Sequence, residues 1–126
     1  MHRSDSIASI GRALASVQAE LGGVIAPDST NPMYDNRYAS LAIIIGSIRA
    51  VLNKFEIALV QAPVPGTVGA MVMETMLIHG PSGEYIGSYC EMPVETLDSH
   101  GVASAQTYAR RYGLMALLGL AQGPDD

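Results

Sequence analysis

The segment from Gly69 to Met92 constrains the fold of this chain more than any other. Gly69–His79 (GAMVMETMLIH) and Glu84–Met92 (EYIGSYCEM) each have the length of a strand, and a tight GPSGE connection joins them. This pattern predicts an antiparallel hairpin. The first strand is apolar on both of its alternating faces. Both faces are therefore expected to be covered, or one of them to meet another subunit.

The rest of the chain predicts three helices and one more strand. Apolar residues at helical spacing predict a first helix over about residues 4–22, with Ser4 or Asp5 as N-cap, and a second from Tyr38 to about Asn53. Residues 24–37 are rich in turn formers and predict a loop. Glu56–Ala62 is a short strand, and residues 101–119 form a last helix with Ser99 as its cap.

These elements predict a single domain over residues 1–126, because a chain of 126 residues has room for one core. The fold class is α+β, with helices on one face of a small three-stranded antiparallel sheet and two helices before the strands.

Composition limits the class of protein. The formal net charge is −5, yet 48% of the residues are hydrophobic. No apolar run reaches the roughly 18 residues of a membrane span, and the N-terminus lacks the apolar core of a signal peptide, so a cytoplasmic protein is expected. Cys90 is the single cysteine, which rules out an internal disulfide. The apolar surplus favours self-association.

Signals for an enzyme are weak. The only lysine, Lys54, is not in a phosphate-binding loop motif, and no GxGxxG occurs. The three histidines and Cys90 lack metal-ligand spacing. A divalent-ion site from Glu84 with Glu91 or Glu95 is the weak alternative. We therefore expect no catalysis, no metal and no cofactor.

The last helix contains a local concentration of positive charge. Arg110 and Arg111 lie between Tyr108 and Tyr112, and no acidic residue occurs between Gly101 and Gly123. Guanidinium groups match phosphate geometry, and tyrosine rings offer stacking surface for bases. From the residues alone, two interpretations stay open. Either this helix contacts nucleic acid, or the tyrosines belong to the core and the arginines form surface ion pairs.

Three stretches, found in this order, resemble the Erf (essential recombination function) family of phage single-strand annealing proteins. They are NPMYDNRYASLAIIIGSIRAVLNKFEIALVQ (31–61), IHGPSGEYIGS (78–88) and GVASAQTYARRYGLMALLGL (101–120). The resemblance covers roughly residues 31–120, and the pattern A-x-T-Y-A-R-R-Y-x-L followed by L-L-G is specific to the family. The family often carries more lysine around the second helix and first strand than is present here. Its longer members continue beyond such a core.

The resemblance implies ATP-independent binding of single-stranded DNA and annealing of complementary strands in phage recombination. It also implies a β-β-β-α core, rings or helical filaments of identical subunits, and the cytoplasm of a bacterial host, where a phage exonuclease or the host single-strand-binding protein are candidate partners. The alternative is an oligomeric protein-interaction module without DNA binding. The resemblance leaves open which of the two neighbouring arginines contacts DNA and which braces the subunit. The residues expected at the DNA are Arg37, Tyr38, Arg49, Lys54, Gln106, Thr107, Tyr108, Arg110, Arg111 and Tyr112.

Overall fold

The computed structural model describes residues 1–23, 29–31, 36–38 and 40–121, with the backbone alone described for 29–31 and 36–38. The elements in chain order are β1 (His2–Arg3), α1 (Ala8–Leu21), β2 (Ser29–Asn31), β3 (Asn36–Tyr38), α2 (Leu41–Lys54), β4 (Ile57–Val64), β5 (Ala70–His79), β6 (Tyr85–Pro93) and α3 (Ser99–Leu118). The fold is therefore α+β, as the sequence predicts.

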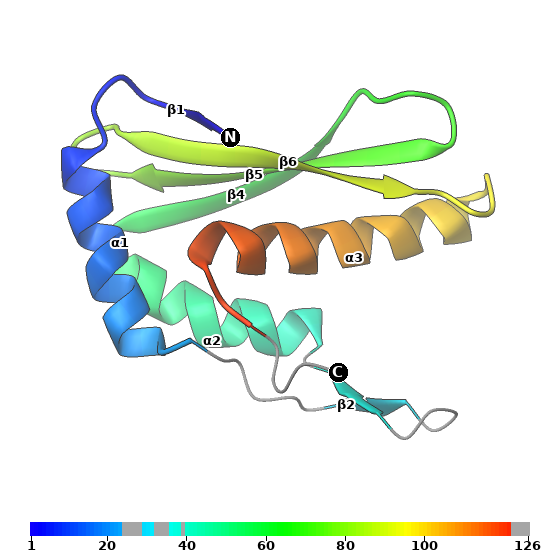
Figure 1. Cartoon of the computed structure of the whole chain (residues 1–126), viewed down its shortest axis with the longest axis horizontal. Helices are drawn as coiled ribbons and strands as arrows, with labels where there is room; N and C mark the ends of the chain where they lie inside the picture. The colour runs from blue at the N-terminus through cyan, green and yellow to red at the C-terminus, as the bar shows by residue number, and fades with distance from the viewer. Residues whose placement is uncertain (24–28, 32–35, 39, 122–126) are drawn as a thin grey trace.

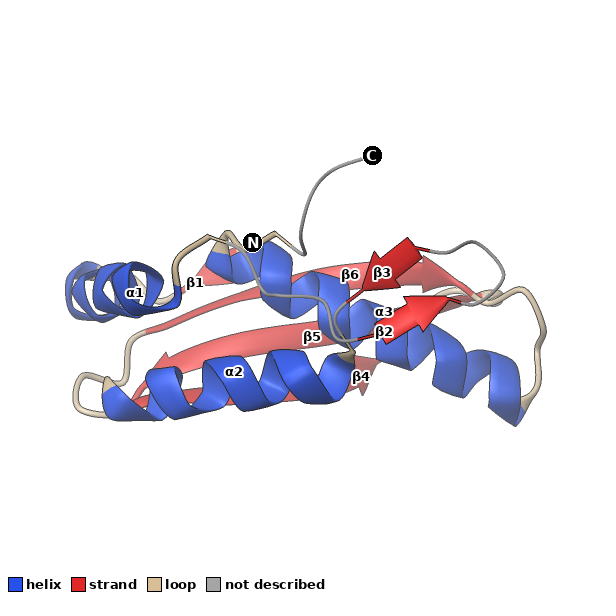
Figure 2. Ribbon diagram, turned by 90° about the horizontal axis from the view of Figure 1, so that it is seen from below, coloured by secondary structure: helices blue, strands red, loops and turns tan. Residues whose placement is uncertain are grey.

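The main sheet has four antiparallel strands in the order β1-β6-β5-β4, and β2 pairs with β3 in a separate two-stranded sheet. All three helices lie on one side of the main sheet (Figure 1). Seen from that side, α2 and α3 lie in front of the long strands and α1 lies near one end (Figure 2). The prediction that the helices share one face of the sheet is confirmed.

The core lies between this helical layer and the inward face of the sheet. Residues of α1, α2 and α3 meet strand residues whose side chains point to the same side. A second, smaller cluster joins the first half of α3 to the other end of β5. The two clusters contain Ile10, Val17, Ile44, Ile48, Leu52, Ile57, Leu77, Ile86, Leu114, Met115 and Leu118, and Met71, Met73, Ala105 and Ala109.

The predicted three-stranded sheet is wrong by one strand. His2 and Arg3 pair with Gly87 and Ile86, so the chain begins with a strand at the edge of β6. A strand of two residues has no alternating pattern of its own. It exists here because β6 offers an edge to pair with, and sequence periodicity cannot detect that.

The predicted loop over residues 24–37 and the predicted start of the second helix at Tyr38 also need correction. Ser29–Asn31 pairs with Asn36–Tyr38, so Tyr38 belongs to β3, and α2 starts later, at Leu41. Ser40 caps it by accepting a hydrogen bond from the Ile43 amide at 3.2 Å. The two N-terminal helices exist, but β1 precedes them and this strand pair separates them. The rest of the predicted loop, 24–28 and 32–35, lies outside the described residues.

The predicted caps of the first and last helices are wrong as well. Asp98, not Ser99, caps α3 by accepting a hydrogen bond from the Gly101 amide at 2.7 Å. At α1 the N-cap position is Ile7, which supplies no side-chain cap, so neither Ser4 nor Asp5 has that role. The cap comes instead from the hairpin connection between β5 and β6. Glu84 Oε1 accepts hydrogen bonds from the amides of Ser9 and Ile10, both at 2.8 Å.

Glu84 thus joins the GPSGE turn to a helix 75 residues earlier in the chain. The hydrogen bond from the Ile10 amide is the main reason that the pKa of Glu84 lies below its ordinary value of 4.5. Bonds from Ser6 and Ser9 and the nearby His79 act in the same direction, while desolvation opposes them. A carboxylate at a helix N-terminus is also favoured by the helix dipole.

Because the folded-state pKa of Glu84 is lowered, its contribution to stability is present above pH 4.5 and is lost as pH falls through the folded value. We expect Glu84→Gln to be less stable than wild type at pH 7, and the difference to shrink below pH 4.5. Urea unfolding at a series of pH values measures this. Glu95→Gln, at an exposed carboxylate after β6, is the control. A difference that stays constant with pH would contradict the role of the charge.

Candidate nucleic-acid interface

Helix α3 lies close against the sheet because small residues line its inward face. Ala105 and Ala109 are buried against Met71 and Met73 of β5. A Cβ added at Gly113 would lie 3.1 Å from Thr75 Oγ1 and 3.5 Å from Cys90 Cβ, so the helix backbone and the strands are nearly in contact there. This close packing determines which side of α3 meets the sheet.

A part-buried polar network ties α3 to two strands. Gln61 of β4 donates from Nε2 to Thr75 Oγ1 and to the Arg110 carbonyl, each at 3.0 Å. Arg110 Nε donates in return to Gln61 Oε1 at 3.2 Å. Thr75 is 1% exposed, so its hydroxyl has little access to water. The guanidinium of Arg110 is consequently held at the crossing of α3 and β4.

Sequence reasoning missed Gln61 and Thr75 as residues that organise this site. The available signal was their position: each is a polar residue flanked by apolar residues on the same side of its strand. Buried polar groups need hydrogen-bond partners, so two such residues in paired strands indicate a shared network. The register confirms that Gln61 and Thr75 are direct cross-strand neighbours.

We expect Gln61→Leu and Thr75→Val each to lower the free energy of unfolding by about 1–3 kcal/mol, because each removes a hydrogen-bond partner from a buried or part-buried group. Since the two share one hydrogen bond, the double variant should cost less than the sum, with a coupling of about 0.5–3 kcal/mol. Denaturant unfolding of wild type, the two single variants and the double variant measures this coupling as a double-mutant cycle. Strictly additive effects would show that the contact contributes nothing.

The two tyrosines of α3 form an exposed stacked pair. The rings of Tyr108 and Tyr112 are nearly parallel, at 9°, with centroids 6.0 Å apart. Tyr108 is 46% exposed and Tyr112 is 47% exposed. Arg111, in contrast, is only 7% exposed, and its guanidinium carbon lies 5.3 Å from the centroid of Tyr108. The tyrosines thus face solvent, with a buried cation beside them.

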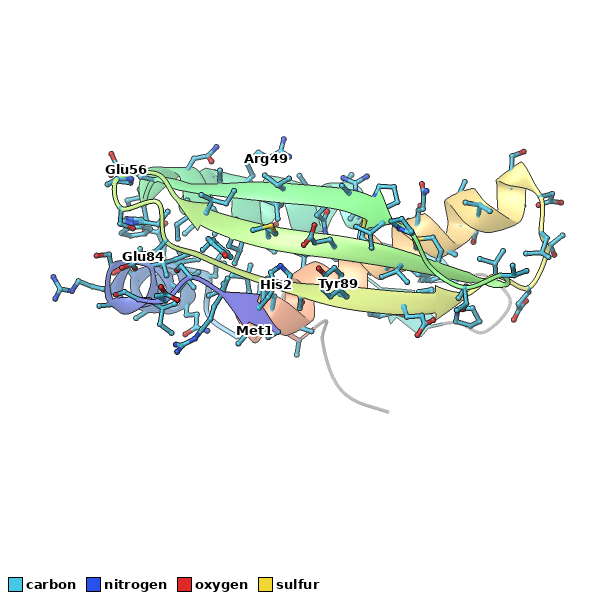
Figure 3. The ribbon with its side chains drawn as sticks, turned by 90° about the horizontal axis from the view of Figure 1, so that it is seen from above. Met1, His2, Arg49, Glu56, Glu84 and Tyr89 are labelled. Carbon is cyan, nitrogen blue, oxygen red and sulfur yellow. The ribbon has the colours of Figure 1, made fainter. Side chains whose placement is uncertain are left out.

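The remaining predicted residues are spread around α3 and α2. On α3, Thr107 is exposed and donates its hydroxyl to the Ala103 carbonyl at 3.1 Å, while Gln106 is half-buried. On α2, Arg49 is exposed and lies beside the β4 edge of the sheet (Figure 3). Lys54 Nζ lies 2.6 Å from Oε1 of Glu20 in α1. Arg37 and Tyr38 lie on β3, where the description covers the backbone alone.

The residues expected at the DNA therefore lie on more than one side of α3. Successive helix residues are separated by about 100°, so Arg110 and Tyr112 point roughly 160° apart. Gln106 and Arg110 share the side next to β4, whereas Tyr108 and Tyr112 share another side. The site has an aromatic side and a basic side, with the buried Arg111 close to the aromatic one.

A hollow of about 390 Å³ adjoins the aromatic side. It lies between the end of β6 and the first turns of α3, and its walls include Pro93, Glu95, His100, Ser104 and Tyr108.

Within the described residues no group of three His, Cys, Asp or Glu side chains could hold a metal ion. In particular, Glu84 is bound to the start of α1, away from Glu91 and Glu95.

No helix in the described part of the chain is long and apolar enough to cross a membrane.

A search of curated proteins finds no significant match, and neither does a search of solved structures. The family profile described as "ERF superfamily" matches residues 10–126, which is nearly the whole chain. The resemblance seen in three stretches thus extends from α1 through the strands to the end of the chain. The chain belongs to the ERF superfamily.

Proposed function

We propose that this protein binds single-stranded DNA and anneals complementary strands, without ATP, in phage homologous recombination. The observation that carries the proposal is the family match over residues 10–126. That match spans β4, β5, β6 and all of α3, including the tyrosines and arginines that the resemblance assigns to DNA.

The aromatic side of α3 supports this function. Exposed tyrosine rings provide stacking surface that accepts any base, because every base has a π-face. Tyr108 and Tyr112 are held parallel and half-exposed, so they are already arranged for such contacts. Arg111 is buried beside Tyr108, and we assign it the bracing role: its guanidinium fixes the ring and contributes positive potential.

The basic side supplies the phosphate contacts in this proposal. Arg110, held by Gln61, and Arg49 on α2 both lie next to β4. Lys54 and Arg37 extend the proposed contacts along α2 and β3, with Tyr38, Gln106 and Thr107 as neighbouring polar or stacking groups. Phosphate contacts position a strand without reading its sequence. Specificity then comes from base pairing with the second strand, whose approach the cations make electrostatically easier.

Subunits side by side, in a ring or a helical filament, would extend these contacts into a continuous track for DNA. The acidic net charge of −5 makes such concentration of positive charge necessary, because an isolated chain repels a polyanion over most of its surface.

A fluorescence assay of annealing between complementary oligonucleotides, without nucleotide, tests the proposal. Dye-labelled strands should pair faster with the protein than alone, and the rate gain should fall as salt rises because phosphate contacts release counterions. Non-complementary strands are the control. No acceleration, together with no retention of single-stranded DNA on filters at low salt, would instead support the interaction module without DNA binding.

A further inference from the structure

The side of the main sheet that faces away from the helices is apolar and open. Strand alternation and register place on it one set of side chains from β4, β5 and β6. No helix in the described part of the chain lies over this surface, as the view from above shows (Figure 3). We call it the open sheet face; its members are Ala58, Val60, Ala62, Val64, Ala70, Val72, Glu74, Met76, Ile78, Tyr85, Gly87, Tyr89, Glu91 and Pro93.

Large apolar side chains on this face are accessible to solvent. Val60 is 46% exposed and Tyr89 is 59% exposed, while Met76 and Ile78 of the central strand β5 are partly exposed. Contiguous apolar patches of this kind are uncommon on monomers and mark sites of interaction. In β5 the apolar residues on this side therefore need an explanation other than the core, which lies on the opposite side.

The one charge near the middle of the open sheet face has a partner. His2 Nε2 lies 3.0 Å from Glu74 Oε2, and the His2 ring lies 5.0 Å from that of Tyr89. A Cβ at Gly87 would lie 2.5 Å from His2 Nε2, so glycine at this position makes room for the imidazole. Strand β1 thus places an imidazole next to the Glu74 carboxylate, so that the carboxylate in the middle of the face has a polar neighbour.

The charged residues of the open sheet face indicate which kind of molecule can cover it. The open sheet face includes no Lys or Arg, and it includes Glu74 and the exposed Glu91. A nucleic-acid backbone would find no lysine or arginine there, and the His2 imidazole is already in contact with Glu74. The apolar side chains of the face suit an equally apolar surface, and the same face of a second copy supplies one.

The dimensions are adequate for such a contact. Ten residues of β5 at about 3.3 Å each, and three strands at about 4.8 Å, span roughly 33 by 14 Å. Two copies together then offer about 900 Å² in projection and more in accessible area, against the roughly 1,000 Å² expected of a biological interface. Sheets stack face to face in this way at a separation of about 10 Å.

We propose that the open sheet face joins two copies of this chain in a two-fold, face-to-face contact. The contact leaves α2 and α3 at the two outer surfaces of the pair, where both proposed DNA-binding sides stay accessible. The inference goes beyond the proposed function, because it requires no DNA.

Light scattering coupled to size exclusion, over a range of concentrations, tests this contact in the full chain with any tag at the C-terminus. Wild type should associate in even numbers. Val60→Glu and Tyr89→Glu each place two unpaired charges in the dimer, so the dissociation constant should rise at least about 100-fold. Val68→Glu is the matched control, because Val68 is 95% exposed in the turn between β4 and β5. His2→Ala should weaken the pair about tenfold by leaving Glu74 unpaired.

The outcomes separate this inference from the proposed function. A monomeric wild type, or equal mass for Val60→Glu and Val68→Glu, overturns it. Loss of single-stranded DNA binding in Val60→Glu at unchanged mass also overturns it, because the face would then be a DNA surface. If wild type pairs through this face yet anneals no DNA, the inference stands and the proposed function fails. Circular dichroism of both sheet variants excludes unfolding as the cause of a lower mass.

Discussion

The double variant Tyr108→Ala/Tyr112→Ala is expected to bind single-stranded DNA about 100-fold more weakly than wild type, because stacking contributes about 1–3 kcal/mol per base. Both rings are nearly half-exposed and parallel, so bases can reach them without rearrangement of α3. Fluorescence anisotropy with a labelled oligonucleotide measures the affinity. The dependence of binding on salt should change little, because the tyrosine rings carry no positive charge and so release no counterions from the phosphates.

The matched control is Tyr108→Phe/Tyr112→Phe, which keeps the rings and removes the hydroxyls. This variant should bind single-stranded DNA as tightly as wild type if the rings contribute to affinity by stacking on bases. Equal loss in the phenylalanine and alanine variants would assign the effect to hydroxyl hydrogen bonds. Wild-type affinity in the alanine variant would remove the tyrosines from the interface and leave the basic side, with Arg49 and Arg110, as the candidate.

Ile44→Ala is expected to lower the free energy of unfolding by about 2–5 kcal/mol, the range for large-to-small substitutions in a packed core. Ile44 is 0% exposed and lies in the main core cluster between α2 and the sheet. The neighbouring residue provides the control. Ile43, on the same helix, is 38% exposed, so Ile43→Ala removes the same atoms from a site that water already reaches.

Ile43→Ala should change stability by less than about 1 kcal/mol, helped by the higher helix propensity of alanine. Urea unfolding monitored by circular dichroism compares the two variants. Similar losses at both positions would mean that α2 buries both sides, for instance in an assembly, and would contradict the orientation of α2 against its own sheet.

The sequence predicted the long elements well because their patterns are local. Helical spacing of apolar residues located α1 and α2 to within a few residues, and the GPSGE turn between two strand-length segments located the β5–β6 hairpin. The inward side of α2 followed from the same spacing, since Ile44, Ile48 and Leu52 are its buried residues. Such patterns survive without tertiary context because one face of each element has to be buried.

Predictions that depended on a distant partner were wrong. The cap of α1 comes from Glu84, and no local rule connects position 84 with positions 9 and 10. Strand β1 exists only through its pairing with β6. A cap search and a periodicity search both look at neighbours in sequence, whereas these two contacts are made between parts of the chain that the fold alone brings together.

The candidate site divides in the same way. By itself, the sequence determined that α3 would be a helix with two arginines and two tyrosines and no acidic residue among them, and its motifs pointed to the ERF superfamily. Only the tertiary structure decided which side each residue faces. Small residues at 105, 109 and 113 set the side of α3 that meets the sheet. That contact turned Arg110 to Gln61, buried Arg111, and left Tyr108 and Tyr112 in solvent. The physical reason is that a helix fixes angles between its residues, while only packing fixes its rotation about its own axis.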